Sequence, residues 1–414
     1  MKKRILLITN GFPFGESERS FLNEEVQKLM EAFDLYILAL DNGDKLLYSS
    51  EGIQRIERYT FTSFSKTKNV RALFHIFDPA TIAETLQFAR KHHFSNIVGN
   101  LKEIVLYRYH AWEAEQQISR LVREENIDLV YTYWCRECTL AALYVKRRFP
   151  KLKVITRFHG YDLYEERAKL GWQPFRKMLA ARADSLIFAC ETGRQYFLSH
   201  WGAGDKTYTF YLGSSGFEKS ETAQSDVLQL ASCSNLIPLK RVEYIIDGLA
   251  QLPKTVKVRW NHFGDGSERQ NLEKMAREKL PAGGNVEWKF WGQVPNRELA
   301  CRYRELGVQL FITTSSTEGG VPVSLQETSA MGIPAVGTAV GGIPEVIMDG
   351  KTGFLLPQNP ETTDVTGAIL KYLNLTQEQR QEMSDAAVTI WQEKFDAKKN
   401  AQRFAAFLQE LVSK

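Results

Sequence analysis

The feature that most constrains the fold is a regular alternation of short apolar segments with longer amphipathic ones, which occurs in both halves of the chain. Short apolar runs bounded by turn signals predict buried strands. In the first half these runs are ILLIT (5–9), LYILAL (35–40), DLVYTYW (128–134), KVITRFHG (153–160) and SLIFAC (185–190). In the second half they are VKVRWNHFG (256–264), VEWKFWG (286–292), VQLFITTS (308–315) and PAVGTAV (334–340). Because strands that alternate with helices form parallel sheets covered on both faces, we expect an α/β protein with two doubly wound domains.

The segments between the predicted strands have the periodicity of amphipathic helices. Apolar side chains recur at helical spacing in residues 18–33, 242–252 and 296–306. After residue 375 the pattern predicts continuous helix to the end of the chain. We expect this terminal helix to cross back onto the first domain.

Length and composition agree with two domains. The chain has 414 residues, of which 43% are hydrophobic and 25% charged, as is typical of a globular protein too long for one ordinary core. The Gly- and Ser-rich stretch 213–226 has no periodicity and predicts the linker. The predicted domains are therefore 1–212, joined by the helix 395–414, and 227–394. Ligands of such sheets bind at the carboxyl ends of the strands, here in a cleft expected beside the linker.

Composition disfavours several classes of protein. No stretch approaches the roughly 18 continuous apolar residues of a membrane span, so we expect a cytoplasmic protein. The CxxC formed by Cys135 and Cys138 lacks a second pair, which favours structural thiols over a zinc or redox site. The seven histidines form only one adjacent pair and no DxD occurs, so no metal site is predicted. Without a strongly basic domain, nucleic acid is not an expected partner.

The clearest candidate site is STEGGVPVSLQE (316–327), which directly follows a predicted strand. Pro322 suits the first turn of a helix, so the helix should begin near it. Gly319 and Gly320, with Val321 after them, leave backbone N–H groups uncovered at the positive end of that helix. A phosphate or sugar hydroxyls could dock there.

Two carboxylates flank this turn. Glu327, inside the predicted helix, could accept two hydrogen bonds from a vicinal diol such as a ribose, and Glu318 would face the group attached beyond the phosphate. The alternative is an ordinary helix start with a capping acid.

The segment from Glu327 to Pro357, ETSAMGIPAVGTAVGGIPEVIMDGKTGFLLP, resembles the donor-site signature of a known enzyme family. The family comprises the retaining nucleotide-sugar glycosyltransferases with the GT-B fold, the family 4-like proteins of glycosyl transferases group 1. Its pattern is E, seven residues, E, then AMxxGxPVVxTxxGGxxEVIxxGxxGxLxP. The resemblance implies two Rossmann-like domains facing across a cleft. It also implies transfer of a sugar from a nucleoside diphosphate to an acceptor hydroxyl with retained configuration.

Other family landmarks occur in the same order along the chain. GFPFGESERSFLNEE (11–25) resembles the first glycine-bearing loop, which implies that Gly15 lies where donor phosphate and acceptor meet. In TRFHGYDLY, His159 and Asp162 match the family's HGxD, which implies that the histidine points at the donor sugar. WNHFGDGSERQNLEK and WGQVPNREL resemble the strands beside the base, which places Gly264 and Val294 there.

The chain departs from the family pattern at two places. The phosphate-gripping RLxxxK has Asn235 at the position of its arginine and Lys240 at that of its lysine, and we expect Arg241 to supply the missing charge. Eight residues, not seven, separate the two glutamates, so either Glu318 or Gly319 takes the first position, and we favour Glu318.

The resemblance implies a front-face attack in which the leaving phosphate takes the acceptor's proton, with no metal and no compulsory protein base. Lys240, Arg241 and the helix N-terminus would stabilise the charge that develops on the diphosphate. The expected donor is a UDP- or GDP-sugar with no further cofactor. The alternatives are an epimerase or phosphorylase of the same fold, or a non-catalytic partner that binds sugar nucleotides.

The expected acceptor is a glycan or a lipid-linked glycan, in polysaccharide or glycoconjugate assembly of bacterial type. Residues 65–77 and 91–110 interleave basic and aromatic side chains, which suits peripheral contact with the anionic inner face of a membrane. Ordinary amphipathic helices explain these segments equally well.

Overall fold

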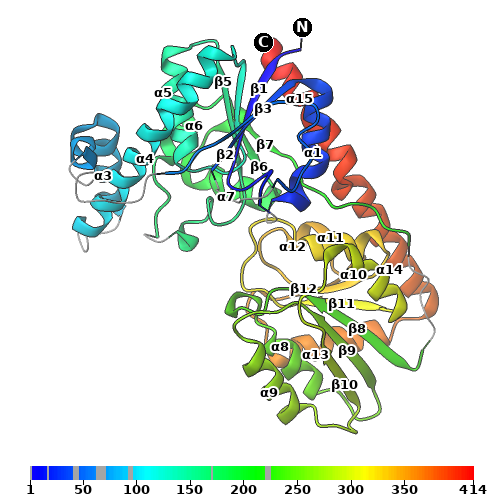
Figure 1. Ribbon diagram of the computed structural model, residues 1–414. Coiled ribbons are helices and arrows are strands. Elements are labelled where there is room, and N and C mark those ends of the chain that lie inside the picture. Colours follow the sequence, from blue (N-terminus) through cyan, green and yellow to red (C-terminus); the bar gives the residue numbers. More distant parts are fainter. Residues whose placement is uncertain are drawn as a thin grey trace. The chain divides into compact units, whose positions relative to one another are not determined.

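The computed structural model describes residues 2–15, 18–40, 46–61, 71–91, 97–168, 171–219 and 225–414. The chain divides into two compact units, Met1–Leu212 with Lys398–Lys414, and Gly213–Ala397. Parts of the predicted linker and of the two predicted membrane-contact segments lie outside the described residues. Each unit is built on one sheet whose strands pair in parallel (Figure 1), which confirms the predicted fold class.

The first unit has a seven-stranded sheet of order β3-β2-β1-β4-β5-β6-β7. Its strands are β1 (Arg4–Thr9), β2 (Asp34–Ala39), β3 (Ile53–Arg58), β4 (Leu129–Thr132), β5 (Lys153–Phe158), β6 (Ser185–Phe188) and β7 (Thr207–Thr209). Its helices are α1 (Arg19–Ala32), α3 (Pro79–Lys91), α4 (Ile97–Glu124), α5 (Glu137–Arg148), α6 (Arg176–Arg182), α7 (Glu191–Trp201) and α15 (Ala397–Ser413). The edge strands β3 and β7 were not predicted.

Alternate residues of β1 face opposite sides of this sheet, as the pleat of a strand requires. Leu6 belongs to the core beneath α4, α5 and α6, and Leu7 belongs to the core beneath α1 and α15 (Figure 1). Phe404 and Leu408 of α15 are buried in the second of these cores. The C-terminal helix is therefore part of the first unit.

A buried ion pair joins α1 to β5 in the core beneath α1 and α15. Nη1 of Arg157, whose side chain is 1% exposed, lies 2.5 Å from a carboxylate oxygen of Glu25, which is 7% exposed. The other oxygen of Glu25 accepts a hydrogen bond from the hydroxyl of Tyr131 at 2.9 Å. The guanidinium also lies over the ring of Phe404, 4.5 Å from its centroid. One charge pair thus connects a helix, two strands and the C-terminal helix.

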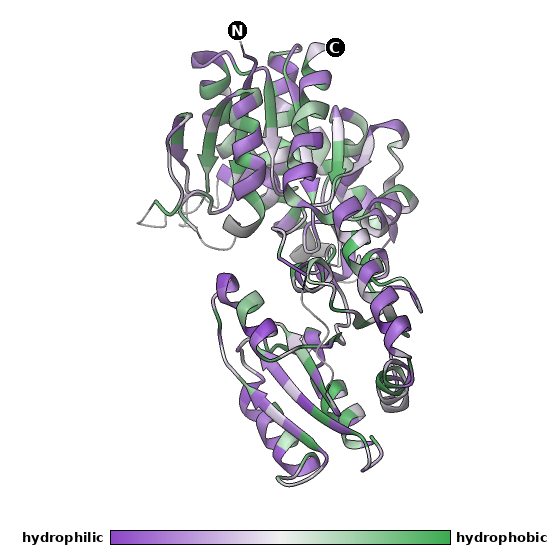
Figure 2. Ribbon diagram, turned by 90° about the vertical axis from the view of Figure 1, so that its right-hand side faces the viewer, coloured by the Kyte–Doolittle hydropathy of each residue, from purple (hydrophilic) through white to green (hydrophobic). Residues whose placement is uncertain are grey.

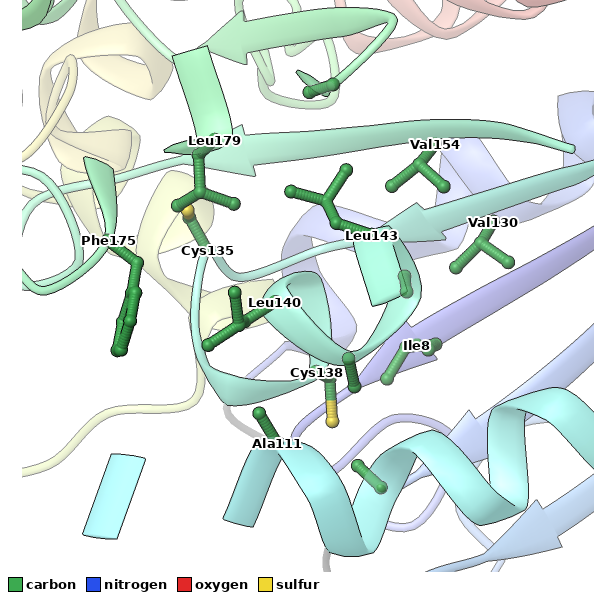
Figure 3. Packing of buried hydrophobic residues seen from close by; sticks show 14 of the residues in the cluster. Ile8, Ala111, Val130, Cys135, Cys138, Leu140, Leu143, Val154, Phe175 and Leu179 are labelled. Atoms are coloured by element: carbon green, nitrogen blue, oxygen red, sulfur yellow. The ribbon is translucent and has the colours of Figure 1, made fainter. Parts of the chain in front are cut away.

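The cysteines of the CxxC lie in the core on the other side of the sheet. Cys135 and Cys138 are buried among apolar side chains and unpaired, and Figure 3 shows their sulfur atoms well separated. Burial raises the pKa of Cys135 to about 11 and also raises the pKa of Cys138. Both are structural thiols by this placement. Cys301, in contrast, is exposed.

The second unit has a six-stranded sheet of order β10-β9-β8-β11-β12-β13. Its strands are β8 (Val227–Cys233), β9 (Lys257–Phe263), β10 (Val286–Phe290), β11 (Leu310–Thr313), β12 (Ala335–Thr338) and β13 (Gly353–Leu356). Its helices are α8 (Glu243–Ala250), α9 (Arg269–Lys279), α10 (Asn296–Glu305), α11 (Val323–Ala330), α12 (Ile343–Val346), α13 (Thr362–Leu373) and α14 (Gln377–Ile390). Helices α8, α9 and α13 cover one face, and α10, α11, α12 and α14 the other (Figure 1).

The prediction of continuous helix after residue 375 is wrong. Helix α14 ends at Ile390, and a wider turn over Trp391–Phe395 and an extended Asp396 separate it from α15. The reason is a competing partner: the backbone N–H of Ser214 donates to Phe395 O at 2.9 Å, and Ala397 N–H donates to Ser214 O at 3.2 Å. Bonds to a distant segment thus replace the helical ones.

The helices carry hydrophilic and hydrophobic residues side by side (Figure 2), as helices that cover a sheet with one face must. Among the described residues, no helix combines the length and apolar character needed to cross a bilayer.

Candidate functional site

The candidate donor site of the second unit is formed by two loops that leave neighbouring strands. β8 and β11 pair in parallel, so the loops after Cys233 and Thr313 emerge at the same edge of the sheet. The loops are fastened to each other, because Ser316 N–H donates to Leu239 O at 2.8 Å and the Thr314 hydroxyl donates to Arg241 O at 2.8 Å. The two contacts join residues that are 77 and 73 positions apart in the sequence.

Lys240 and Glu318 meet where these loops touch. The ammonium of Lys240 lies 2.5 Å from Oε1 of Glu318, and the two side chains are 23% and 14% exposed. A half-buried pair of this kind holds a cation at the strand ends while leaving it open to solvent on one side. An incoming anion could therefore compete with Glu318 for the ammonium.

The guanidinium of Arg241 is bonded to the loops around it. Its Nε donates to Thr314 O, its Nη2 to Ser315 O and Gln358 O, and its Nη1 to Asn359 Oδ1. The backbone of Arg241 is left-handed, with φ of 47°. Since these loop oxygens occupy its guanidinium, Arg241 fastens the loops, and Lys240 is the cation that the structure presents for an anion.

The loop before α11 rests on the two glycines that follow β12. A Cβ on Gly341, whose φ is +52°, would lie 2.3 Å from Glu318 O, and one on Gly342 would lie 2.6 Å from Val321 N. Gly342 N–H donates to Gly320 O at 3.2 Å. The family-like GG pair is thus required for steric reasons, because it lets the loop of Glu318 approach the backbone behind it.

We expect Gly341→Ala to lower kcat/KM about a hundredfold, since displacing a positioning loop by about 1 Å costs that much. Gly283→Ala is the matched control, because Gly283 also has a positive φ, of +79°, but nothing lies within 4 Å of its Cβ position. Steady-state kinetics with a melting curve for each variant tests this. Equal activity of the two variants would show that the contact with Glu318 is unimportant.

Glu327 lies one helical turn inside α11, as predicted, and is 6% exposed. Its Oε1 accepts a hydrogen bond from Nδ2 of Asn296, at the start of α10, at 2.7 Å. Burial raises the pKa of Glu327 to about 7, although this hydrogen bond acts in the opposite direction. Asn296 was not predicted as a site residue. The only feature of the sequence that could have pointed to Asn296 is its position at the start of a predicted helix, directly after WGQVP. The predicted residue Val294 lies two positions before it and is half-buried.

The remaining predicted donor-site residues lie in these loops or in a loop packed against them. A Cβ on Gly264, which follows β9, would lie 2.0 Å from Ser234 O, so this glycine lets two loops pack closely. Asn235 accepts a hydrogen bond from Ile237 N–H through its backbone oxygen, at 3.0 Å. Pro322 is the residue before α11, which begins at Val323, one position later than the proline would suggest.

The candidate residues of the first unit lie in two loops at the carboxyl ends of its strands. Asp162 accepts hydrogen bonds from His159 N–H at 2.8 Å and from Cys135 N–H at 2.9 Å, so it fixes the loop that carries the histidine. The imidazole of His159 packs on Trp134, with ring centroids 4.0 Å apart. Neither ring nitrogen has a hydrogen-bond partner among the described residues, although both are buried and Nδ1 lies 3.8 Å from Oδ2 of Asp162.

The loop that contains Gly15 is fixed by a carboxylate that sequence reasoning did not single out. Glu18, 1% exposed, accepts hydrogen bonds from the backbone N–H groups of Asn10, Gly11 and Phe12 and from Trp134 Nε1. Gly15 N–H donates to Gly11 O at 2.7 Å. The same tryptophan contacts both Glu18 and His159, so it links the two loops of this unit.

The described residues contain no group of His, Cys, Asp and Glu side chains arranged to hold a metal ion. The second unit offers a ligand a lysine, two carboxylates and the backbone amides at the start of a helix. The first unit offers an imidazole that makes no hydrogen bond with a described residue.

Comparison with known proteins shows which proteins the chain resembles. Residues 217–389 match the family model described as glycosyl transferases group 1. A putative colanic acid biosynthesis glycosyltransferase, WcaL of Salmonella typhimurium, is 27% identical over 214 residues, which are 50% of this chain and 52% of that protein. The chain thus aligns with about half the length of that relative.

Two further matches cover more of the chain. The N-acetyl-alpha-D-glucosaminyl L-malate synthase of Bacillus anthracis is 22% identical over 339 residues, 77% of this chain and 84% of that one. The crystal structure of HepE from Anabaena in complex with UDP superposes with a TM-score of 0.69 at 16% identity, over 99% of this chain and 100% of that one. Residues 217–389 therefore resemble the glycosyl transferases group 1 proteins, and the whole chain has the GT-B fold.

Proposed function

We propose that the protein transfers a sugar from a nucleoside-diphosphate sugar to an acceptor hydroxyl, with retention and without a metal ion. The observation that carries this proposal is the Lys240–Glu318 pair at the loop leading into α11, with the buried Glu327 on that helix. Glu318 lies in the loop that leads into α11 and Glu327 lies on that helix, so both carboxylates belong to the same loop and helix. A cation for a diphosphate and a carboxylate for a diol are the groups that a sugar nucleotide needs.

In the proposed reaction the bond between the sugar and the diphosphate breaks, and negative charge develops on the leaving oxygen. Lys240 and the backbone amides of Gly319, Gly320 and Val321 would stabilise that charge. The leaving oxygen then takes the proton of the acceptor hydroxyl, which attacks from the same face. Glu318 would hold sugar hydroxyls, and His159 would contact the donor sugar through one of its unbonded nitrogens.

The proposed donor is a UDP- or GDP-sugar, a choice supported by the UDP bound in the HepE structure. A thermal-shift panel of UDP-, GDP- and ADP-sugars tests it, because a ligand that binds only the folded protein raises its melting temperature. We expect a UDP- or GDP-sugar to give the largest shift, and transfer to a glycan panel to follow with that donor. A panel without any shift would contradict the proposal.

The proposed acceptor is a glycan or lipid-linked glycan, reached by peripheral contact of the first unit with the inner face of a membrane. Exposed apolar side chains lie before and within α3, namely Leu73, Phe74, Phe77, Ile82 and Leu86. Such side chains beside basic residues suit insertion into an anionic interface. Liposome sedimentation at low and high salt tests this, and binding that is absent at low salt would exclude it.

Donor binding should depend on pH through Glu327. A diol donates hydrogen bonds to a carboxylate, so binding favours the ionised form, and the pKa of the free group is about 7. Affinity for a UDP- or GDP-sugar should therefore fall below pH 7 by up to about tenfold per pH unit and stay constant above it. The diphosphate of a sugar nucleotide does not titrate in this range. Calorimetric titrations should show this profile, and Glu327→Gln should flatten it; a flat profile in the unsubstituted protein would refute the ribose role.

A further inference from the structure

A second binding site is indicated by a cavity of about 500 Å³ within the first unit. It lies between α4, the start of α5, the loop after β5 and the segment leading into α6. Neither His159 nor Gly15 lines it, and the donor-site residues belong to the other unit. A pocket of this size holds one or two sugar rings.

The aromatic wall of the cavity is attached to the loop of His159. Tyr161, which lines the cavity, packs on Trp134 with centroids 4.9 Å apart, and Trp134 packs in turn on His159. The Tyr161 hydroxyl accepts a hydrogen bond from Asn10 Nδ2 at 3.1 Å. Trp172 also lines the cavity. Flat aromatic faces with polar edges suit the apolar face and the hydroxyl groups of a sugar ring.

Three arginines line the cavity, and they differ in what they bind. Nη2 of Arg176, which is 2% exposed, donates to Cys135 O, Asp162 O and Gln173 Oε1. This arginine therefore holds the wall together and is not available to a ligand.

The other two arginines are nearer to solvent. Arg136 pairs with the adjacent Glu137, at 3.2 Å. Arg167 is half-buried, and its side chain makes no hydrogen bond or ion pair with any described residue. Glu103 is the remaining carboxylate of the wall, and it could accept hydrogen bonds from sugar hydroxyls. Arg167 thus supplies an uncommitted guanidinium in a pocket whose other lining charges lie beside partners or could bind hydroxyls.

We propose that this cavity binds the end of the acceptor and that this end is a sugar bearing an oxyanion, either a carboxylate or a phosphate. The guanidinium of Arg167 would form two parallel hydrogen bonds with it, and the aromatic wall would pack on the ring. The role as an acceptor site rests on the proposed glycosyl transfer, but the binding itself does not.

The test uses the full chain saturated with UDP, so that the nucleotide site is occupied. Methyl glucuronide, glucose 1-phosphate and neutral methyl glucoside are titrated by ligand-observed NMR. One or both anionic probes should bind about tenfold more tightly than methyl glucoside, as expected for a charge-assisted hydrogen bond. If methyl glucuronide shows the preference, the oxyanion of the acceptor is a carboxylate; if glucose 1-phosphate shows it, the oxyanion is a phosphate.

Arg167→Ala should abolish that preference, and the fold should survive because the side chain has no hydrogen-bond or ion-pair partner among the described residues. Arg123→Ala is the matched control, because Arg123 is an exposed arginine of α4 that does not line the cavity. This variant should keep the preference for the anionic probes. Equal binding of all three probes, no binding of any, or an unchanged preference in Arg167→Ala overturns the inference. A protein that does not bind UDP but keeps the anion preference would instead count against the proposed donor site.

Discussion

Replacing Lys240 with alanine should lower kcat by about 10²- to 10³-fold, the usual cost of removing one group that stabilises charge in a transition state. The structure gives the reason, because Lys240 is the cation held at the strand ends whose partner, Glu318, leaves it accessible. Steady-state kinetics with the preferred donor measures the effect. Lys254→Ala is the control, because that lysine is exposed on the same unit and makes no ion pair with a described residue.

The pair also allows a sharper test. If Lys240 only positions Glu318, then Lys240→Ala should cause no further loss in protein that already carries Glu318→Ala. If the lysine neutralises the diphosphate itself, the double variant should be slower than Glu318→Ala alone. A fully active Lys240→Ala protein with an unchanged melting temperature would remove the lysine from the mechanism.

Removing Glu25, the buried acid that pairs with Arg157 in the first unit, should have a large effect on stability. Glu25→Ala leaves the charge of Arg157 in the core without its carboxylate and deprives the Tyr131 hydroxyl of its acceptor. Breaking a buried pair in this way costs roughly 3–5 kcal/mol. We expect a loss of that size in the urea transition that belongs to the first unit.

Two variants show whether the cost comes from the unpaired charge. Glu31→Ala removes an exposed acid from the same helix, where it pairs with Lys28, and should change stability by less than about 1 kcal/mol. The double substitution Glu25→Leu with Arg157→Met should recover most of the loss, because it removes both charges together. If Glu25→Ala is as stable as Glu31→Ala, the pair does not stabilise the fold.

Most of the central strands of the two sheets were predictable because they are buried and form apolar runs in the sequence. The strand β3, IQRIER, was missed because it lies at an edge and only Ile53 and Ile56 in it are apolar. β8, VLQLASC, is central, but Gln229 and Ser232 interrupt its apolar run, and it directly follows the linker. The break before α15 has neither glycine nor proline at its centre, since its cause is a bond to Ser214 far away in sequence.

The candidate site shows the same limit. The glycines, Lys240 and the two glutamates could be found because they lie close together in the sequence or match a family pattern. The residues that position these side chains could not be found from the sequence. Asn296 reaches Glu327 from another helix, and the acceptors of Arg241 come from loops more than 70 residues away. Charge alone suggested a ligand for Arg241, whereas its left-handed backbone directs the guanidinium to carbonyl oxygens.

The distribution of the cysteines makes the protein convenient for spectroscopy. Cys301 is the exposed thiol, whereas Cys135, Cys138 and Cys190 are buried and burial raises the pKa of Cys233 to about 11. A maleimide dye should therefore attach to α10 first, a little more than one turn from Asn296, the partner of Glu327. A fluorophore at that position would report occupancy of the proposed nucleoside pocket in real time without any engineered cysteine.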